Sequence, residues 1–208
     1  MFEVLTGTGL AASAGLNAYI PLLTVGLLAR FTDLFDLPDP WQWLANGWVI
    51  AIMAVLLVVE VVADKVPVLD HINDLLQTVV RPASGGLVFG AGASGGEGDA
   101  VTVSDPGAFV SGGQWAPVVA GIVIALIVHG LKTTARPVIN ATTGGLGAPV
   151  ASTAEDATSV AMSLVAIMLP ALVLVFLVAL VFSAGWIWRR RRFRRRERAA
   201  AREAGFDV

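Results

Sequence analysis

Four long runs of apolar residues, at positions 5–29, 48–63, 115–131 and 158–188, constrain what this chain can fold into. A helix rises about 1.5 Å per residue, so roughly 20 apolar residues cross the hydrocarbon core of a bilayer. Every backbone amide and carbonyl in that core needs a partner, and a helix supplies one within the segment itself. We therefore expect an all-α polytopic membrane protein with about four transmembrane helices.

The composition agrees with a membrane protein. Of the 208 residues, 56% are hydrophobic and 14% are charged, and the mean hydropathy is +0.75. Soluble domains carry about one quarter charged residues. The chain has no cysteine, which excludes disulfides and thiolate metal sites. The first residues lack the basic region of a secretory signal, so we expect the first run to remain in the membrane.

The segments between the runs predict one or two short re-entrant or interfacial helices. Residues 70–80 have polar and apolar faces at helical spacing and predict an amphipathic helix. Residues 83–96 are apolar but short and rich in glycine, which favours a re-entrant segment. Residues 137–149 are small and polar and predict irregular backbone. Ser152 and Glu155 then predict a capping box at a helix start.

Two of the runs contain residues that interrupt a helix. Asn17, Tyr19 and Pro21 fall near the middle of the first run. They predict either a packing kink or a broken helix that exposes backbone groups to a solute. Pro170 falls near the middle of the last run and predicts a kinked or tilted helix.

An arginine-rich tail follows the last run directly. Nine of the fourteen basic residues lie in the last twenty positions. The positive-inside rule predicts a cytoplasmic C-terminus in the cell membrane, with the tail bound to anionic lipid and not to nucleic acid. We therefore divide the chain into a helical transmembrane domain, residues 1–188, and a cytoplasmic tail, residues 189–208.

Ionisable residues stand at the ends of the second and third runs, where a bilayer makes charge costly. Glu60 and Asp64 are four residues apart, on one face of a helix. The third run ends in His129, Lys132 and Arg136, which also share a face. With four crossings these acidic and basic halves would end on opposite faces of the membrane. They would meet only through broken or re-entrant segments, or through another subunit.

Arg81–Pro82 and Arg136–Pro137 each stand beside an irregular, glycine-rich segment, as in the broken-helix pairs of secondary transporters. A helix that starts at either proline would direct free amides at an anion while its arginine supplies charge. We predict no catalytic residue and no cofactor, and leave open whether a metal binds. The candidate ligand-binding residues are Asn17, Tyr19, Glu60, Asp64, Lys65, Arg81, His129, Lys132, Arg136, Asn140, Glu155 and Asp156.

The order of these landmarks resembles a widespread family of small bacterial integral membrane proteins catalogued as a domain of unknown function. The matching features are an Asn-Ala-Tyr at 17–19, an Ala-Asp-Lys at 63–65, the Arg81–Pro82 corner and the Glu155–Asp156 pair. The resemblance covers nearly the whole chain apart from the tail, and residues 90–113 depart from it by being more polar and glycine-rich. It implies an all-helical membrane domain and supplies no activity.

Three classes of function fit the charges. The first is a transporter or channel for a small solute or ion, in which Glu60 and Asp64 bind a proton or cation; so short a chain would need an oligomer, commonly a dimer, to enclose a pathway. The alternative is a non-catalytic membrane scaffold or assembly factor, with purely structural ion pairs. The third is an intramembrane enzyme with a metal at Asp70, His71 and Asp74, but their spacing matches no known zinc motif, so we expect no enzyme.

Overall fold

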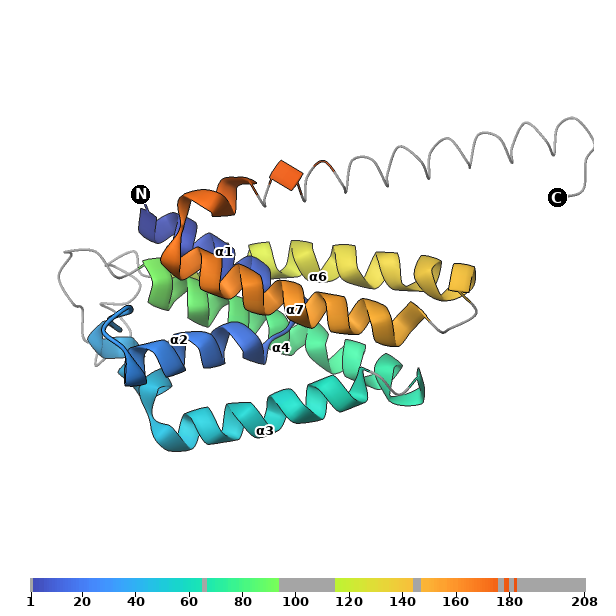
Figure 1. The fold of residues 1–208 in the computed structure, drawn as a ribbon, viewed down its shortest axis with the longest axis horizontal. Helices are drawn as coiled ribbons and strands as arrows, with labels where there is room; N and C mark the ends of the chain where they lie inside the picture. Colours follow the sequence, from blue (N-terminus) through green and yellow to red (C-terminus); the bar gives the residue numbers. More distant parts are fainter. Residues whose placement is uncertain are drawn as a thin grey trace, which may run out of the picture. The chain divides into compact units, whose positions relative to one another are not determined.

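A computed structural model describes residues 2–64, 67–93, 115–143, 147–175, 178–179 and 182 (Figure 1). Every regular element in these residues is a helix. The chain divides into two compact units, Met1–Val173 and Leu174–Val208. The seven elements named below all lie in the first unit, and the predicted all-α fold is confirmed for the described part of the chain.

The first apolar run forms two helices, α1 (Phe2–Leu16) and α2 (Tyr19–Phe31). Between them, the Oδ1 of Asn17 accepts hydrogen bonds from the amides of Tyr19 at 3.0 Å and Ile20 at 3.2 Å. A helix start leaves such amides without backbone partners, and the Asn17 side chain satisfies two of them. The helix is therefore broken here, as in the second alternative, but Asn17 already satisfies these two amides, and the exposure of backbone groups to a solute stays a prediction.

The second apolar run forms α3 (Gly47–Ala63), preceded by a short 3₁₀ helix, η1 (Asp39–Ala45). The side chain of Asn46 accepts a hydrogen bond from the Trp48 amide at 2.9 Å and so caps α3. α3 packs against α2. Its other sides carry large exposed apolar residues, as a lipid-facing helix would: Ile52, Val55, Val58, Val59 and Val62.

Residues 67–93 form one helix, α4 (Pro67–Ala93), of 27 residues. Residues 70–80 are helical as predicted, but the helix continues through residues 81–93, so the prediction of a separate re-entrant segment was wrong for the described residues. The glycine-rich half is helical because its glycines permit close packing on α6. A Cβ on Gly85 would lie 2.5 Å from the Cβ of Ala125 and 2.8 Å from the carbonyl oxygen of Gly121. These glycines indicate a tight helix interface and not irregular backbone.

The third run forms α6 (Trp115–Thr143), which continues through Pro137, and α7 (Gly147–Met168) follows. We predicted irregular backbone over residues 137–149. For the described residues this prediction was wrong, because residues 137–143 and 147–149 are helical. The capping box was also wrong, since Ser152 is buried inside α7. Neither Pro82 nor Pro137 begins a helix. α7 ends just before Leu169 and Pro170, where we predicted a kink.

α1 is the helix that contacts α4, α6 and α7 together (Figure 1). Its small residues allow the close approach: a Cβ on Gly15 would lie 2.7 Å from the carbonyl oxygen of Ala125. The hydroxyl of Ser13 lies 2.7 Å from those of Ser159 and Ser163, in a buried cluster that joins α1 to α7. Small and hydroxyl-bearing residues are the common means of packing helices in a bilayer.

One stretch of the described residues, Trp115–Arg136 in α6, is long and apolar enough to cross a bilayer, with 22 residues and a mean hydropathy of 1.9. Only 28% of its most apolar window is buried inside the structure, unlike the core helix of a soluble protein. Tyr19–Phe31 and Gly47–Ala63 are shorter apolar helices. The helices are thus compatible with a membrane bundle by length and composition, and the number of crossings stays a prediction.

We predict that Gly85→Val destabilises the bundle by about 1–3 kcal/mol, because the larger side chain overpacks the interface of α4 with α6. Gly130→Ala on α6 is the matched control, since nothing lies within 4 Å of a Cβ at that position. It should leave stability unchanged or raise it by up to about 1 kcal/mol. Unfolding of the purified variants in detergent micelles measures both. Equal effects would contradict the packing described here.

Candidate functional site

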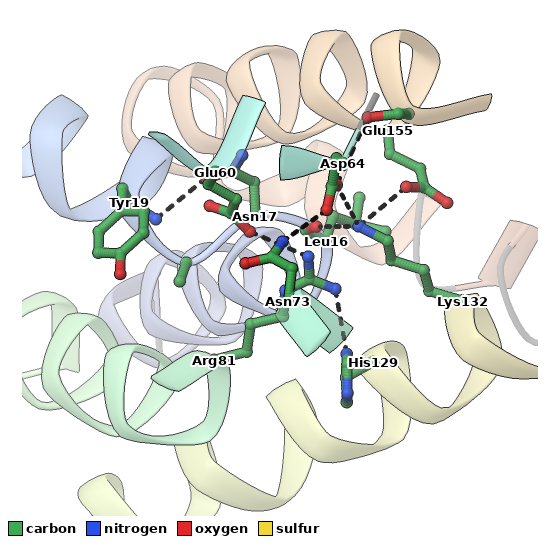
Figure 2. A network of polar contacts seen from close by, with 12 residues as sticks. Leu16, Asn17, Tyr19, Glu60, Asp64, Asn73, Arg81, His129, Lys132 and Glu155 are labelled. Carbon is green, nitrogen blue, oxygen red and sulfur yellow. Dashed lines mark hydrogen bonds and ion pairs between the residues drawn. The ribbon is translucent and has the colours of Figure 1, made fainter. Parts of the chain in front are cut away.

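Charged side chains from four helices meet beside the C-terminal end of α3 (Figure 2). Those from α3, α4 and α6, together with Asp64 directly after α3, are at most 7% exposed. Glu155 joins them from α7, with its side chain 17% exposed. We call this set the buried charge cluster; it comprises Glu60, Asp64, Arg81, His129, Lys132, Arg136 and Glu155.

The acidic and basic halves of the cluster meet because α4 is continuous. In Figure 1, α3 and α6 run in one direction and α4 runs back between them in the other. The C-terminal parts of α3 and α6 therefore lie at the same end of the bundle. The prediction that the halves end on opposite faces depended on residues 83–96 not forming a full-length helix, and it was wrong.

Asp64 uses both of its carboxylate oxygens. Its Oδ2 lies 3.0 Å from the Nη2 of Arg136, 3.4 Å from the Nζ of Lys132 and 3.4 Å from the Oγ of Ser152. Its Oδ1 accepts a hydrogen bond from the side-chain Nδ2 of Asn73 at 2.7 Å. Asp64 thereby joins α3 to α4, α6 and α7, and its charge is compensated by two cations.

Glu155 shares the same two cations. Its Oε2 lies 2.9 Å from Lys132 and 3.1 Å from Arg136. Lys132 also donates to the carbonyl oxygen of Leu16 at 3.1 Å. Leu16 is the last residue of α1, and the end of a helix leaves carbonyls without partners and favours a positive charge. The cluster therefore stabilises the break between α1 and α2.

A second chain of contacts runs from Glu60 through Arg81 to His129. The Nη2 of Arg81 lies 2.9 Å from the Oε1 of Glu60, and its Nη1 lies 3.0 Å from the Nδ1 of His129. A guanidinium only donates, so Nδ1 is an acceptor and the ring is neutral, with its proton on Nε2. Nε2 lies 3.3 Å from the hydroxyl of Thr78. Arg81 is thus held between one carboxylate and one neutral imidazole.

This second chain leaves three buried atoms unpaired. Within the part of the chain that the structure describes, Glu60 Oε2, Arg81 Nε and Gln77 Oε1 have no hydrogen-bond partner. Buried polar atoms in folded proteins nearly always have one. The cluster therefore has two parts: saturated contacts around Asp64, and spare hydrogen-bonding capacity around Glu60 and Arg81.

Two further candidate residues, Asn17 and Asp156, lie beside the cluster. The Nδ2 of Asn17 donates to the Oδ1 of Asp156 at 2.9 Å, which joins the helix break to α7. Tyr19 is half-buried at the start of α2, and the charge of Glu60 acts on its phenol. Lys65 and the side chain of Asn140 lie outside the described residues.

Sequence reasoning missed Asn73 and Gln77 as site residues. Both are on α4. Asn73, Gln77 and Arg81 follow one another at intervals of four residues. That spacing places all three on one helix face and was the signal that could have found them. The side chains of Asp70, His71 and Asp74 lie outside the described residues. Within the described ranges, no group of three or more histidine, cysteine, aspartate or glutamate side chains is placed to hold a metal ion.

Comparison with known proteins gives one match. The model of a family described as a domain of unknown function, DUF4126, matches residues 4–190. No curated protein and no solved structure matches the chain. The matched range includes α1 from residue 4 onward, the described elements from α2 to α7, and every residue of the buried charge cluster.

We predict that Asp64→Asn lowers the free energy of unfolding by about 3–5 kcal/mol, because it takes a carboxylate from two buried cations. Glu155→Gln should be milder, since Glu155 is partly exposed and its loss leaves Asp64 on both cations. Asp33→Asn, at an exposed position, is the control and should change nothing measurable. Chemical unfolding in detergent compares the three variants. If Asp64→Asn is no worse than Glu155→Gln, Asp64 is not the centre of the network.

Proposed function

The chain belongs to the DUF4126 family, and we propose that it is a small membrane transporter or channel whose buried charge cluster binds the ion that is moved. The proposal includes several membrane crossings, a cytoplasmic C-terminus, and an oligomer that encloses the pathway. The arginine-rich tail, residues 189–208, lies outside the described residues, and its binding to anionic lipid is part of the same proposal.

The observation that supports transport most is the incomplete pairing of Glu60. It is 2% exposed and contacts Arg81 through one oxygen, while its Oε2 has no partner in the described part of the chain. Leaving a buried polar atom unpaired costs about 1–3 kcal/mol. A network that served stability alone would gain by satisfying that atom, so we assign to Glu60 the uptake of a proton or small cation.

The break between α1 and α2 supports the same proposal. Secondary transporters commonly place their binding sites where helices are interrupted. Here the end of α1 accepts a hydrogen bond from Lys132, a member of the cluster. The start of α2 brings the half-buried Tyr19 within electrostatic range of Glu60.

The two carboxylates of α3 then have different roles. Asp64, with two cations, an amide and a hydroxyl around it, fixes the helices in place. Glu60, with one spare oxygen, changes its proton or ion content. Arg81 and His129 lie next to Glu60 and receive the effect of that change.

The second candidate function is a non-catalytic membrane scaffold, and the saturation of Asp64 favours it. Four contacts to that one carboxylate are what a structural ion-pair network requires. In this alternative, the large exposed apolar residues of α3 would contact a protein partner as well as lipid.

Proton movement into liposomes separates the two functions. A pH gradient is imposed across liposomes in a mixture of potassium nitrate and potassium chloride, with valinomycin present. We expect liposomes that contain the purified wild-type protein to take up protons faster than empty liposomes do. Glu60→Gln cannot take up a proton and should reduce the rate to the empty-liposome level. Asp33→Asn removes one exposed carboxylate and should keep the wild-type rate. A wild-type rate in Glu60→Gln contradicts the role of Glu60. No proton flux in the wild type, together with no sodium or potassium flux in liposomes without valinomycin, favours the scaffold.

A further inference from the structure

We propose that the cluster also binds a small monovalent oxyanion, such as a carboxylate or nitrate-like ion, which replaces Glu60 on Arg81 when Glu60 is protonated. The inference deepens the transport proposal and rests on it, because it names the class of ion that accompanies the proton. It is carried by the pairing of Arg81 with Glu60 and by the geometry around Arg81.

Arg81 and Glu60 neutralise each other only while Glu60 is ionised. The other neighbour of the Arg81 guanidinium, His129, is neutral because it accepts a hydrogen bond from Arg81. Protonation of Glu60 therefore leaves the charge of Arg81, a residue that is 0% exposed, without a carboxylate contact among the described residues. A buried charge without a counter-charge is costly, and one monovalent anion removes the excess.

The excess charge falls on Arg81. Lys132 and Arg136 each keep two carboxylate contacts, to Asp64 and Glu155, whatever the state of Glu60. Arg81 has Glu60 as its one carboxylate contact among the described residues. The guanidinium of Arg81 is therefore where an incoming anion would bind.

On the edge of the Arg81 guanidinium that faces Glu60, only one of the two nitrogens has a hydrogen-bond partner among the described residues. Nε and Nη2 point along the same edge of a guanidinium, and together they match the two oxygens of an oxyanion. Glu60 contacts Nη2 through Oε1 at 2.9 Å, while its Oε2 and the Nε of Arg81 both lack partners. An oxyanion on this edge would form two hydrogen bonds where Glu60 forms one.

The other groups that act on Glu60 fit this exchange. Arg81 and Lys132 attract a negative charge at Glu60, whereas Asp64 repels one. Asp64 is already compensated by Lys132 and Arg136, so its repulsion is reduced. The half-buried Tyr19 of α2 lies within electrostatic range of the same carboxylate. A proton on Glu60 and an anion on Arg81 together add no net charge to the cluster.

Thermal unfolding in detergent tests the anion site without requiring transport. Nitrate or lactate replaces chloride at constant ionic strength, and the unfolding temperature of each variant is measured. Glu60→Gln mimics the protonated carboxyl, so its unfolding temperature should rise in both oxyanions relative to chloride. The double variant Glu60→Gln/Arg81→Gln lacks both charges and should show no such rise. No rise in Glu60→Gln, or an equal rise in the double variant, overturns the proposal.

The wild-type protein gives a second measurement that does not depend on the folding of a variant. The rise in nitrate and lactate over chloride should be present at acidic pH, where Glu60 is protonated, and absent at neutral pH. An equal rise at both pH values would show a general salt effect and overturn the proposal. Oxyanion binding without proton movement would contradict the transport function alone. Proton movement without an oxyanion-linked rise would contradict the anion site alone.

Discussion

Charge buried among apolar helices has to be neutralised where it lies, and that requirement orders the helices of this protein. Asp64 brings together cations from α6, an amide from α4 and a hydroxyl from α7. Lys132 extends the same network to the end of α1. A desolvated ion tolerates few alternative positions for its partners, because a displaced partner leaves a bare charge. The ion pairs therefore fix the register of helices whose apolar surfaces alone would permit sliding.

The cluster divides stability and function between two neighbouring carboxylates on α3. Around Asp64 every oxygen has a partner, and the loss of any one partner leaves others in place. Around Glu60 the contacts are fewer, and three buried atoms of the described residues stay unpaired. Proteins commonly break the rules of good packing at functional sites and compensate for it elsewhere. The saturated contacts of Asp64 are a source of stability that offsets the unsatisfied ones.

Sequence reasoning found the residues of the cluster better than the path of the chain. Hydropathy and helical spacing correctly placed Glu60 with Asp64, and His129 with Lys132 and Arg136. Glycine and proline were misleading in α4 and α6, because their helix-breaking character is measured in water. Inside a bundle the glycines of α4 permit contact with α6, and Pro82 and Pro137 lie within long helices. Glu155 binds Lys132 and Arg136 instead of capping a helix, a choice that depends on residues distant in sequence.

The order of the helices along the chain determines when each of these polar contacts can form during synthesis. Glu60 and Arg81 are 21 residues apart and belong to the consecutive helices α3 and α4, so one helical hairpin neutralises both as the chain is synthesised. Asp64 can pair with Arg136 only after a further 72 residues have been synthesised. Asn17 reaches its partner later still, because Asp156 lies 139 residues beyond it. The polar gap in the first apolar run therefore lacks this partner until α7 has been synthesised, so the first helices of the chain complete their polar contacts among the last.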